Sequence, residues 1–565
     1  MKRHLLAKGL VILGISISAS AISAMTDDYP NYQPMPSGYG YMEENEALEK
    51  AIKNKDHAKG HAVVREHGWK LWAGIMQPAE SVGWPLWYTW PNTVTAFKPE
   101  SSNKCQTNQS ANELGASNQA SSTDDSKSRP SLINKNQLNS PADRVKHTDI
   151  PHANFDDDFI PYYPIPEPVK KKYWEVITYD SNGDPNISSV EEDDCKKDNF
   201  LFNGDIMIPT ESLNMELTEW IRDPEQPLYK RVTLSQMYKD GQKNLDTPEK
   251  AIVTKHMYWP VKKEGLTAIP VWREDYLGEP LSAKNENYPF YAGYEMWKTL
   301  AAIDPSGEKV GNKEKVSYLY GVSYKEQPEN FAPVTAEAEV FGLESFYYHQ
   351  VTQEEWNNFS KADQAILSAS SYWANGKPFE PGDYLVTIAM HINTKEVPTW
   401  SLTSVWWSDR PNEGQYAKNR PVLPNAKGAW DHYLLVDSHG IPQKGISGRD
   451  TKEKLPVAMN PYIEPVVHPI VTNCNNCHIR AGWPTGGQLT ERKASYQNPD
   501  CPSLLDKLST DDACLDGFIL TDFQWFIPGH AIASKEGEFC LLDDDCEEGT
   551  TCQLKEGLTA YGACK

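Results

Sequence analysis

Two cysteines and a histidine in residues 472–484, TNCNNCHIRAGWP, have the types and spacing needed to hold an iron porphyrin covalently. Cys474 and Cys477 are separated by two residues, and His478 follows directly. Thiols at this spacing can meet both vinyl groups on one side of a haem, and an imidazole directly after them can reach the iron. Chance rarely produces this pattern, because the chain has 10 Cys and 14 His among 565 residues. The sequence therefore predicts covalently attached haem c at these three residues.

Two other uses of a C-x-x-C pair are less favoured. A zinc knuckle needs a second pair of ligands at comparable spacing, and the sequence offers none. A thioredoxin-like redox site, with or without a disulfide between its cysteines, is expected in a strand–helix–strand setting. The Pro- and Asn-rich segment VVHPIVTNCNNC, residues 466–477, does not provide that setting.

The N-terminus predicts export. Residues 1–24 combine a charged start, an apolar run over residues 9–17 and small residues, with cleavage expected after Ala21 or Ala24, as in a secretory signal peptide. The alternative is a membrane anchor, which is disfavoured because a bilayer span needs ~20 apolar residues. We expect a periplasmic or secreted protein whose mature chain has no membrane span.

Export changes what the remaining cysteines predict, because thiols outside the cytosol tend to pair. Cys501 and Cys514 could close a small loop, and Cys105 and Cys195 are then left for each other. A short Cys-rich tail, residues 536–565, should need two disulfides because it is too small to build a core. Its cysteines are Cys540, Cys546, Cys552 and Cys564, whose connectivity the sequence leaves open.

The chain is strongly acidic. Its 55 Lys and Arg against 78 Asp and Glu give a formal net charge of -23. Such a surface repels phosphate backbones and anionic lipid, which argues against nucleic acid as a partner. A redox partner protein of basic charge, or a small-molecule substrate, is the expected partner.

The order of sequence patterns predicts an α+β protein that is mostly β. We expect a β-sandwich or distorted barrel as the body. One helix should interrupt the strands: it is capped at Thr352, with Glu355 three residues on, and runs to about Ser370. The strand-like runs alternate apolar residues and are rich in β-branched and aromatic types. They are residues 250–259, 268–272, 315–324, 344–351, 383–392, 399–407 and 430–436. The predicted segments are an N-terminal helical part (25–98, with two helices in 44–76), a low-complexity surface insertion (99–158), the β-rich body (159–470), the haem c attachment region (471–535) and the Cys-rich tail (536–565).

Through CNNCH the chain resembles exported bacterial c-type haem proteins. The resemblance implies that Cys474 and Cys477 carry the thioethers and that His478 is the proximal iron ligand. Four further phrases are similar to ones in large single-haem, cytochrome c-like bacterial proteins, which implies a relationship of fold and no activity. They are REHGWKLWAGI (65–75), GLTAIPVW (265–272), AMHINTKEVPTW (389–400) and WWSDRP (406–411).

The sixth iron ligand is not fixed by the sequence. Small electron carriers have a Met well downstream of the motif, but here no Met follows Met459. His391 is one candidate, as distal ligand or catalytic base; the alternative is a structural core histidine bonded to backbone. Its neighbour Met390 should face the other side of a strand. His530 is the only later His. Weaker candidates are His468 and Met459, and an open site is also possible. Arg480 could pair a haem propionate or lie in solvent.

Two classes of function, and a third alternative, fit these residues. The sequence predicts an exported monohaem c-type protein with a redox, electron-transfer role. The alternative is a haem-dependent oxidoreductase, peroxidase- or oxygenase-like, with an open distal site, which the length of the chain would suit. A haem-based gas sensor is the third possibility. No distal Arg/His pair and no other catalytic motif can be assembled from the sequence.

Overall fold

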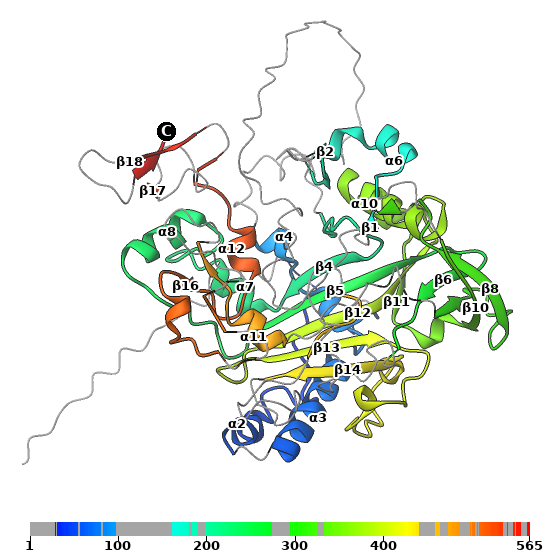
Figure 1. Ribbon diagram of the computed structural model, residues 1–565, viewed down its shortest axis with the longest axis horizontal. Helices are drawn as coiled ribbons and strands as arrows, with labels where there is room; N and C mark the ends of the chain where they lie inside the picture. The colour runs from blue at the N-terminus through cyan, green and yellow to red at the C-terminus, as the bar shows by residue number, and fades with distance from the viewer. Residues whose placement is uncertain are drawn as a thin grey trace, which may run out of the picture.

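The computed structural model (Figure 1) describes residues 29–97, 161–273, 294–439, 458–484 and 498–565. Gaps inside these ranges fall at 30, 55–56, 81–82, 180–182, 190–197, 295–296, 298, 322, 325–332, 464–472, 499, 503–505, 507, 535–538, 541–545, 548–549 and 555–561. The predicted signal peptide 1–24, the insertion 99–158, the Cys105–Cys195 pair and His468 lie outside the described residues. Within the described part of the chain, no helix is both long and apolar enough to span a bilayer.

A six-stranded antiparallel sheet positions the elements of interest. Its strands follow the order β14-β13-β12-β5-β4, and β11 pairs with the first residues of β12 beyond the end of β13. The long strands are rich in β-branched and aromatic residues, which suit a pleated surface. The bounds are β4 Ile208–Leu213, β5 Ile252–Val261, β11 Tyr348–Gln350, β12 Tyr384–Thr394, β13 Ser401–Trp407 and β14 Tyr433–Ser438.

A second sheet of four strands has the order β6-β7-β10-β8. Only the β7–β10 pair in it is parallel. Along the paired length of β8 and β10, exposed residues alternate with buried or half-buried ones, as in a sheet with one face toward the core and one toward solvent. The bounds are β6 Thr267–Pro270, β7 Leu300–Ile303, β8 Lys313–Tyr318 and β10 Val334–Phe341.

Smaller strands complete the β structure. β1 (Pro161–Tyr162) pairs with β9 (Ser323–Tyr324), and β2 (Ile177–Tyr179) with β3 (Pro185–Ile187). β15 (Gly482–Trp483) pairs with β16 (Ile519–Leu520). The tail forms a three-stranded sheet of β17 (Phe539–Cys540), β19 (Gly562–Cys564) and β18 (Cys552–Leu554).

Helices pack around the sheets. α2 packs on α3, α3 packs on β13 and β14, and α10 packs on β5 and β6. The bounds are α2 Asn45–Lys53, α3 His57–Ile75, α4 Thr93–Ala96, α6 Glu167–Lys172, α7 Met215–Ile221, α8 Arg231–Lys239, α9 Gln353–Asn358, α10 Lys361–Asn375, α11 Cys474–His478 and α12 Phe526–His530.

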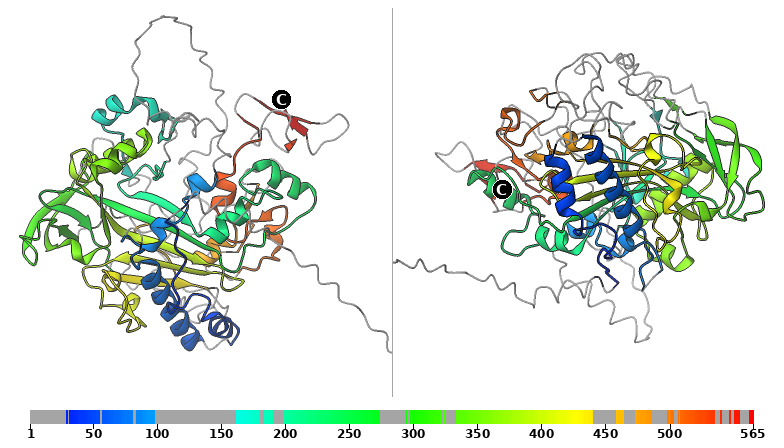
Figure 2. Two further views of the ribbon diagram at one scale, coloured as in Figure 1. Left: turned by 180° about the vertical axis from the view of Figure 1, so that it is seen from behind. Right: turned by 90° about the horizontal axis from the view of Figure 1, so that it is seen from below.

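The last two residues of β14 show that different parts of the chain cover the two faces of the main sheet. Successive residues of a strand point to opposite faces. Asp437 points toward α3, where a methyl group added at Gly68 would lie 3.0 Å from its Oδ2. Ser438 points the other way and bonds to Asn473 and Asn475 at α11. In Figure 2 the blue N-terminal helices lie on one side of the sheet and the orange C-terminal segments on the other.

Two apolar cores meet at α11. The larger core joins both sheets, α3 and α10, and the smaller one joins α7 and α8 to the segment 479–531. Cys474 packs against both cores. The CNNCH segment therefore lies at the boundary between the β-rich body and the C-terminal part of the chain.

The predicted class, α+β with more strand than helix, N-terminal helices and a disulfide-rich C-terminal region, is confirmed. The distorted barrel is wrong, because no described sheet closes on itself. The helix expected from Thr352 to about Ser370 is two helices: the predicted capping box starts α9, but Phe359 leaves the helical region and Ser360 caps α10. Two predicted strands begin late, since residues 343–345 and 430–432 are short 3-10 helices.

Candidate haem attachment site

The helix that carries the motif is one turn long and is fastened at its start. Asn473 caps α11 by accepting a hydrogen bond from the Asn476 backbone N–H, at 3.3 Å. The Ser438 hydroxyl donates to Asn473 Oδ1 (2.7 Å) and accepts from the Asn475 backbone N–H (3.1 Å). Side-chain oxygens thus satisfy N–H groups that a helix start leaves without partners. The last residue of β14 therefore fixes the position of the motif on the sheet.

Cys474 and Cys477 are the two described cysteines that are not in a disulfide. Both are half-buried, and the Cys474 thiol donates to the carbonyl of Ala458 at 3.2 Å. The other six described cysteines pair as Cys501–Cys514, Cys540–Cys552 and Cys546–Cys564. The loop pair and the two bridges of the tail confirm those disulfide predictions. Such bridges are typical of oxidising compartments, and in this chain they leave the C-x-x-C pair as thiols.

His478 is held in the tautomer that a metal ligand needs. Its Nδ1 lies 2.7 Å from the carbonyl oxygen of Phe523. A carbonyl can only accept, so Nδ1 carries the proton and the lone pair is on Nε2. Metal-binding histidines almost always donate their other ring N–H to a carbonyl or carboxylate, which fixes the ring and raises its basicity. His478 thus has the second-nitrogen partner expected of an Nε2 ligand.

The turn that presents the Phe523 carbonyl is strained. Asp522 and Phe523 have φ of 49° and 69°, a left-handed region that costs non-glycine residues energy and that clusters at functional sites. The Asp522 carboxylate holds the turn by accepting from Lys395 Nζ (2.7 Å), Trp400 Nε1 (3.3 Å) and the Thr247 backbone N–H (3.1 Å). This turn could not be predicted from the sequence, because nothing in TDFQW, residues 521–525, distinguishes it from an ordinary loop.

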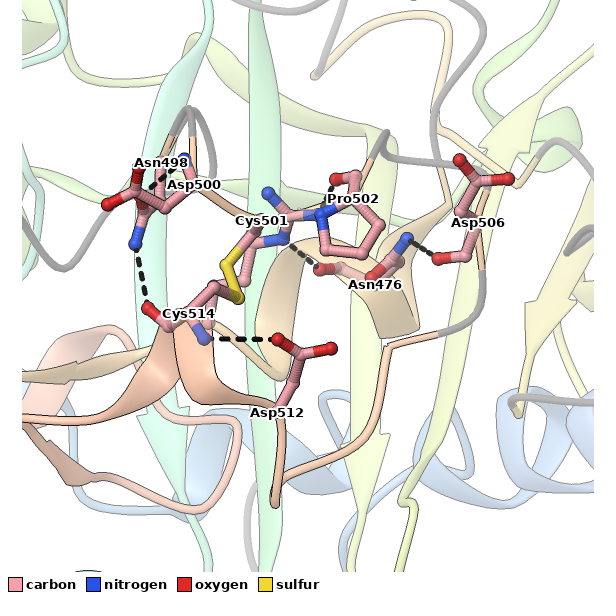
Figure 3. The surroundings of a disulfide bond; sticks show 9 residues. Asn476, Asn498, Asp500, Cys501, Pro502, Asp506, Asp512 and Cys514 are labelled. Carbon is pink, nitrogen blue, oxygen red and sulfur yellow. Dashed lines mark hydrogen bonds between the residues drawn. A yellow bond between two sulfur atoms is a disulfide. The ribbon is translucent and has the colours of Figure 1, made fainter.

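A disulfide loop holds the other side of α11, as Figure 3 shows for Cys501–Cys514 and Asn476. Asn476 Nδ2 donates to the carbonyl of Asp506 at 2.7 Å. Arg480 donates from Nε to the carbonyl of Asn476 (3.1 Å) and from Nη2 to that of Pro502 (2.6 Å). Arg480 is buried, so the solvent-exposed alternative is wrong, and burial lowers the pKa of its guanidinium. This arginine clamps the motif helix to the loop.

His391 lies on the face of the sheet that α11 covers. Leu402 on β13 is opposite Ser438 on β14 and also opposite Asn393 on β12, so the side chains of Asn393 and Ser438 lie on the same face of the sheet. His391 is two residues from Asn393 on β12 and therefore points to the same side. Its cross-strand neighbours are Ser404 and Lys255. The neighbour predicted to face away, Met390, is buried in the larger core.

The same register row continues to His530. Lys255 is opposite Glu211 on β4, and Glu211 pairs with both Lys255 Nζ and His530 Nε2 at 3.5 Å. Burial would raise the pKa of Glu211, but Lys255 and His530 more than offset this and lower it to about 2. The structure thus brings His391 and His530 to one row of one face. Met459, by contrast, packs in the larger core.

The donor set around CNNCH fits a haem c. Two thiols, an imidazole with its lone pair on Nε2 and an adjoining apolar core are the groups that such a cofactor requires. Elsewhere among the described residues, the one cluster close enough to share a metal is Cys540, Cys546 and Cys564. Those three sulfurs belong to disulfides, whereas a metal needs thiolates.

No protein-family model matches this chain, and neither a curated protein nor a solved structure is significantly similar to it.

Proposed function

We propose that this chain is an exported c-type haem protein with a redox role. Cys474 and Cys477 would form the two thioethers, and His478 would bind the iron through Nε2. The observation that carries the proposal is the hydrogen bond from His478 Nδ1 to the Phe523 carbonyl, together with two motif thiols outside any disulfide. The described disulfides support an oxidising compartment.

When bound, the haem would supply a one-electron ferric–ferrous couple. The chain's own residues would then set its properties. The Phe523 carbonyl orients the His478 ring and raises its basicity. The Cys501–Cys514 loop, through Asn476 and Arg480, keeps the motif helix from moving as the iron changes its charge. A rigid attachment of this kind suits electron transfer.

A haem-dependent oxidoreductase is the second candidate, and one observation favours it. The side chain of Lys255, on an interior strand of the main sheet, is 41% exposed. The neighbouring residues of this face on the same strand are buried, so solvent reaches the face at this side chain, where a small substrate could also enter. This function would require the iron to keep one coordination position without a protein ligand.

The haem assignment is tested by removing the two motif thiols together. The full-length chain is made in cells that mature c-type cytochromes, with Cys474→Ala plus Cys477→Ala as the variant. The matched control is Cys540→Ala plus Cys552→Ala, which removes one bridge of the tail and leaves the motif. We expect covalent haem, measured by peptide mass and by haem stain after denaturation, in the parent and the control and none in the motif variant. A colourless parent chain, or haem stain that survives in the motif variant, contradicts the proposal.

A further inference from the structure

Three residues with a strained backbone form one chain of contacts that ends at His478. Among the described residues, six that are not glycine have left-handed φ angles, and three of these six are Trp400 (57°), Asp522 (49°) and Phe523 (69°). Trp400 donates from Nε1 to Asp522 at 3.3 Å, and the carbonyl of the next residue, Phe523, accepts from His478. Strained conformations persist only where the surrounding structure holds them, and they cluster at functional sites. Some group must therefore hold this chain of contacts in place.

The Asp522 carboxylate is that group. Its Oδ1 accepts from Lys395 Nζ at 2.7 Å and from Trp400 Nε1, and its Oδ2 accepts from the Thr247 backbone N–H at 3.1 Å. Little of the ion pair is open to water, since the side chains of Lys395 and Asp522 are 12% and 10% exposed. Charge-assisted hydrogen bonds are strong, and they are stronger where water is excluded. Because the three donors come from three separate segments, they fix the position of Asp522 relative to the main sheet.

The turn between β12 and β13, residues 395–400, also holds the motif helix. The Thr399 carbonyl accepts from Asn475 Nδ2 at 2.6 Å. The next residue, Trp400, bonds to Asp522. Neighbouring residues of one turn thus hold the helix that carries His478 and the strained turn that supplies its hydrogen-bond partner. The distance between the imidazole and that partner therefore depends on the contacts of Asp522.

We infer that Asp522 is a positioning residue of the haem site, which aims the Phe523 carbonyl at Nδ1 of His478 and so sets the basicity of the iron ligand. The inference rests on the proposed function and deepens it, because it names the side chain that adjusts the reduction potential. A histidine whose Nδ1–H is bonded to a carbonyl is a more basic ligand, which favours the ferric form. When the carbonyl moves away, the basicity falls and the potential rises.

The test compares two uncharged replacements of Asp522 in the full-length haem-loaded chain. Asp522→Asn keeps an oxygen acceptor in a residue type that tolerates a left-handed backbone, whereas Asp522→Ala offers neither. Because both variants lack the same charge, a difference between their reduction potentials reports on positioning. We expect redox titration to give a higher potential for Asp522→Ala than for Asp522→Asn. Should Asp522→Ala not fold, Asp522→Gly takes its place, since glycine adopts the left-handed φ without strain but cannot hold the turn.

A second measurement needs no haem. In the full-length chain made without haem and carrying isotope-labelled histidine, the Nδ1–H of His478 should give an NMR signal in the parent and in Asp522→Asn. This signal should be lost, or exchange faster with water, in Asp522→Ala. The matched control is Asp409→Ala, which breaks a similarly buried pair with Arg273 (12% and 17% exposed) beyond the opposite end of β13. It should lower the free energy of unfolding and leave the potential and the His478 signal unchanged.

The possible outcomes separate this inference from the proposed function. Equal potentials in Asp522→Ala and Asp522→Asn, or a His478 signal that is unchanged in Asp522→Ala, overturn the inference and leave the haem site standing. The same changes in Asp409→Ala also overturn it, because they would then report a general loss of stability. A parent without covalent haem overturns the proposed function itself, and the NMR comparison still decides whether Asp522 positions the carbonyl.

Discussion

The two faces of the main sheet each carry a group of three charged side chains that includes a histidine–carboxylate pair, but the groups differ in burial. Toward α3, His67 lies between Glu396 (Nε2–Oε2 2.7 Å) and Glu44 (Nδ1–Oε2 3.3 Å), and the side chains of His67 and Glu396 are both 0% exposed. Toward α11, Glu211 lies between Lys255 and His530, whose side chains are 41% and 31% exposed.

The difference separates a structural group from a group available for chemistry. A charged pair that is fully buried depends on both partners, because either one left alone is a buried charge without compensation. A pair with half-exposed partners can exchange them for water at little cost. The α3 face therefore should control stability and the α11 face should control the properties of the iron site.

The largest loss of stability is expected from a substitution in the buried group on the α3 face. Glu396→Gln keeps the shape of the side chain and removes the charge that faces His67. Since breaking a buried ion pair costs about 3–5 kcal/mol, we expect the free energy of unfolding, from urea titration, to fall by about that amount. The visible spectrum of the haem-loaded chain should not change. A loss below about 1 kcal/mol would mean that the buried pair is not structural.

The pH dependence of the free energy of unfolding tests the same buried group on the α3 face. Burial lowers the pKa of His67, but hydrogen bonds to Glu396 and Glu44 and the charge of nearby Asp437 raise it to about 9. Because the folded pKa lies above the ordinary value near 6.5, this histidine's contribution to stability is complete below pH 6.5 and is lost as the pH rises through 9. Asp437, whose pKa is raised to about 6 mainly by burial, loses its contribution earlier, as the pH rises from about 4 to 6.

The free energy of unfolding is therefore expected to decrease between pH 7 and pH 9.5, by at most about 3 kcal/mol for a shift of this size. His67→Gln, an uncharged residue of similar reach, should be less stable at pH 7 and nearly independent of pH in that interval. Lys70 also contacts Glu44, so Lys70→Met is the control for a general change of charge at this site. A parent and a His67→Gln variant with equal slopes would refute the assignment.

Much of the fold could be predicted, because periodicity and caps are local signals. The strand that became β12 was predicted as residues 383–392 and observed as Tyr384–Thr394, and the capping box at Thr352 was correct. The break between α9 and α10 was missed, since Ser360 reads as an ordinary helix residue until its cap is seen. The pairing of Cys501 with Cys514 followed from their proximity in the chain.

Only part of the candidate site could be predicted from the sequence. The CNNCH motif predicts the chemistry of the site. The carbonyl that orients His478, however, belongs to Phe523, 45 residues away, and every residue type has the same backbone carbonyl, so the sequence does not indicate which one is used. His391 could be placed on a strand but not on a face relative to the motif. That placement depends on register across β12, β13 and β14, which is set by tertiary packing rather than by local pattern.

The smallest expected effect on stability comes from the exposed group. Glu211→Gln is the exact counterpart of Glu396→Gln in chemistry, but water can replace the carboxylate for Lys255 and His530. We expect the free energy of unfolding to fall, because Lys255 and His530 lower the pKa of Glu211, but by less than in Glu396→Gln, because both partners are partly exposed to water. Removing a negative charge beside the iron disfavours the ferric form, so the reduction potential of the haem-loaded chain should rise, whereas Glu396→Gln should leave it unchanged. Redox titration of the two variants side by side measures this, and equal potentials would show that the row of Glu211, Lys255 and His391 does not face the metal.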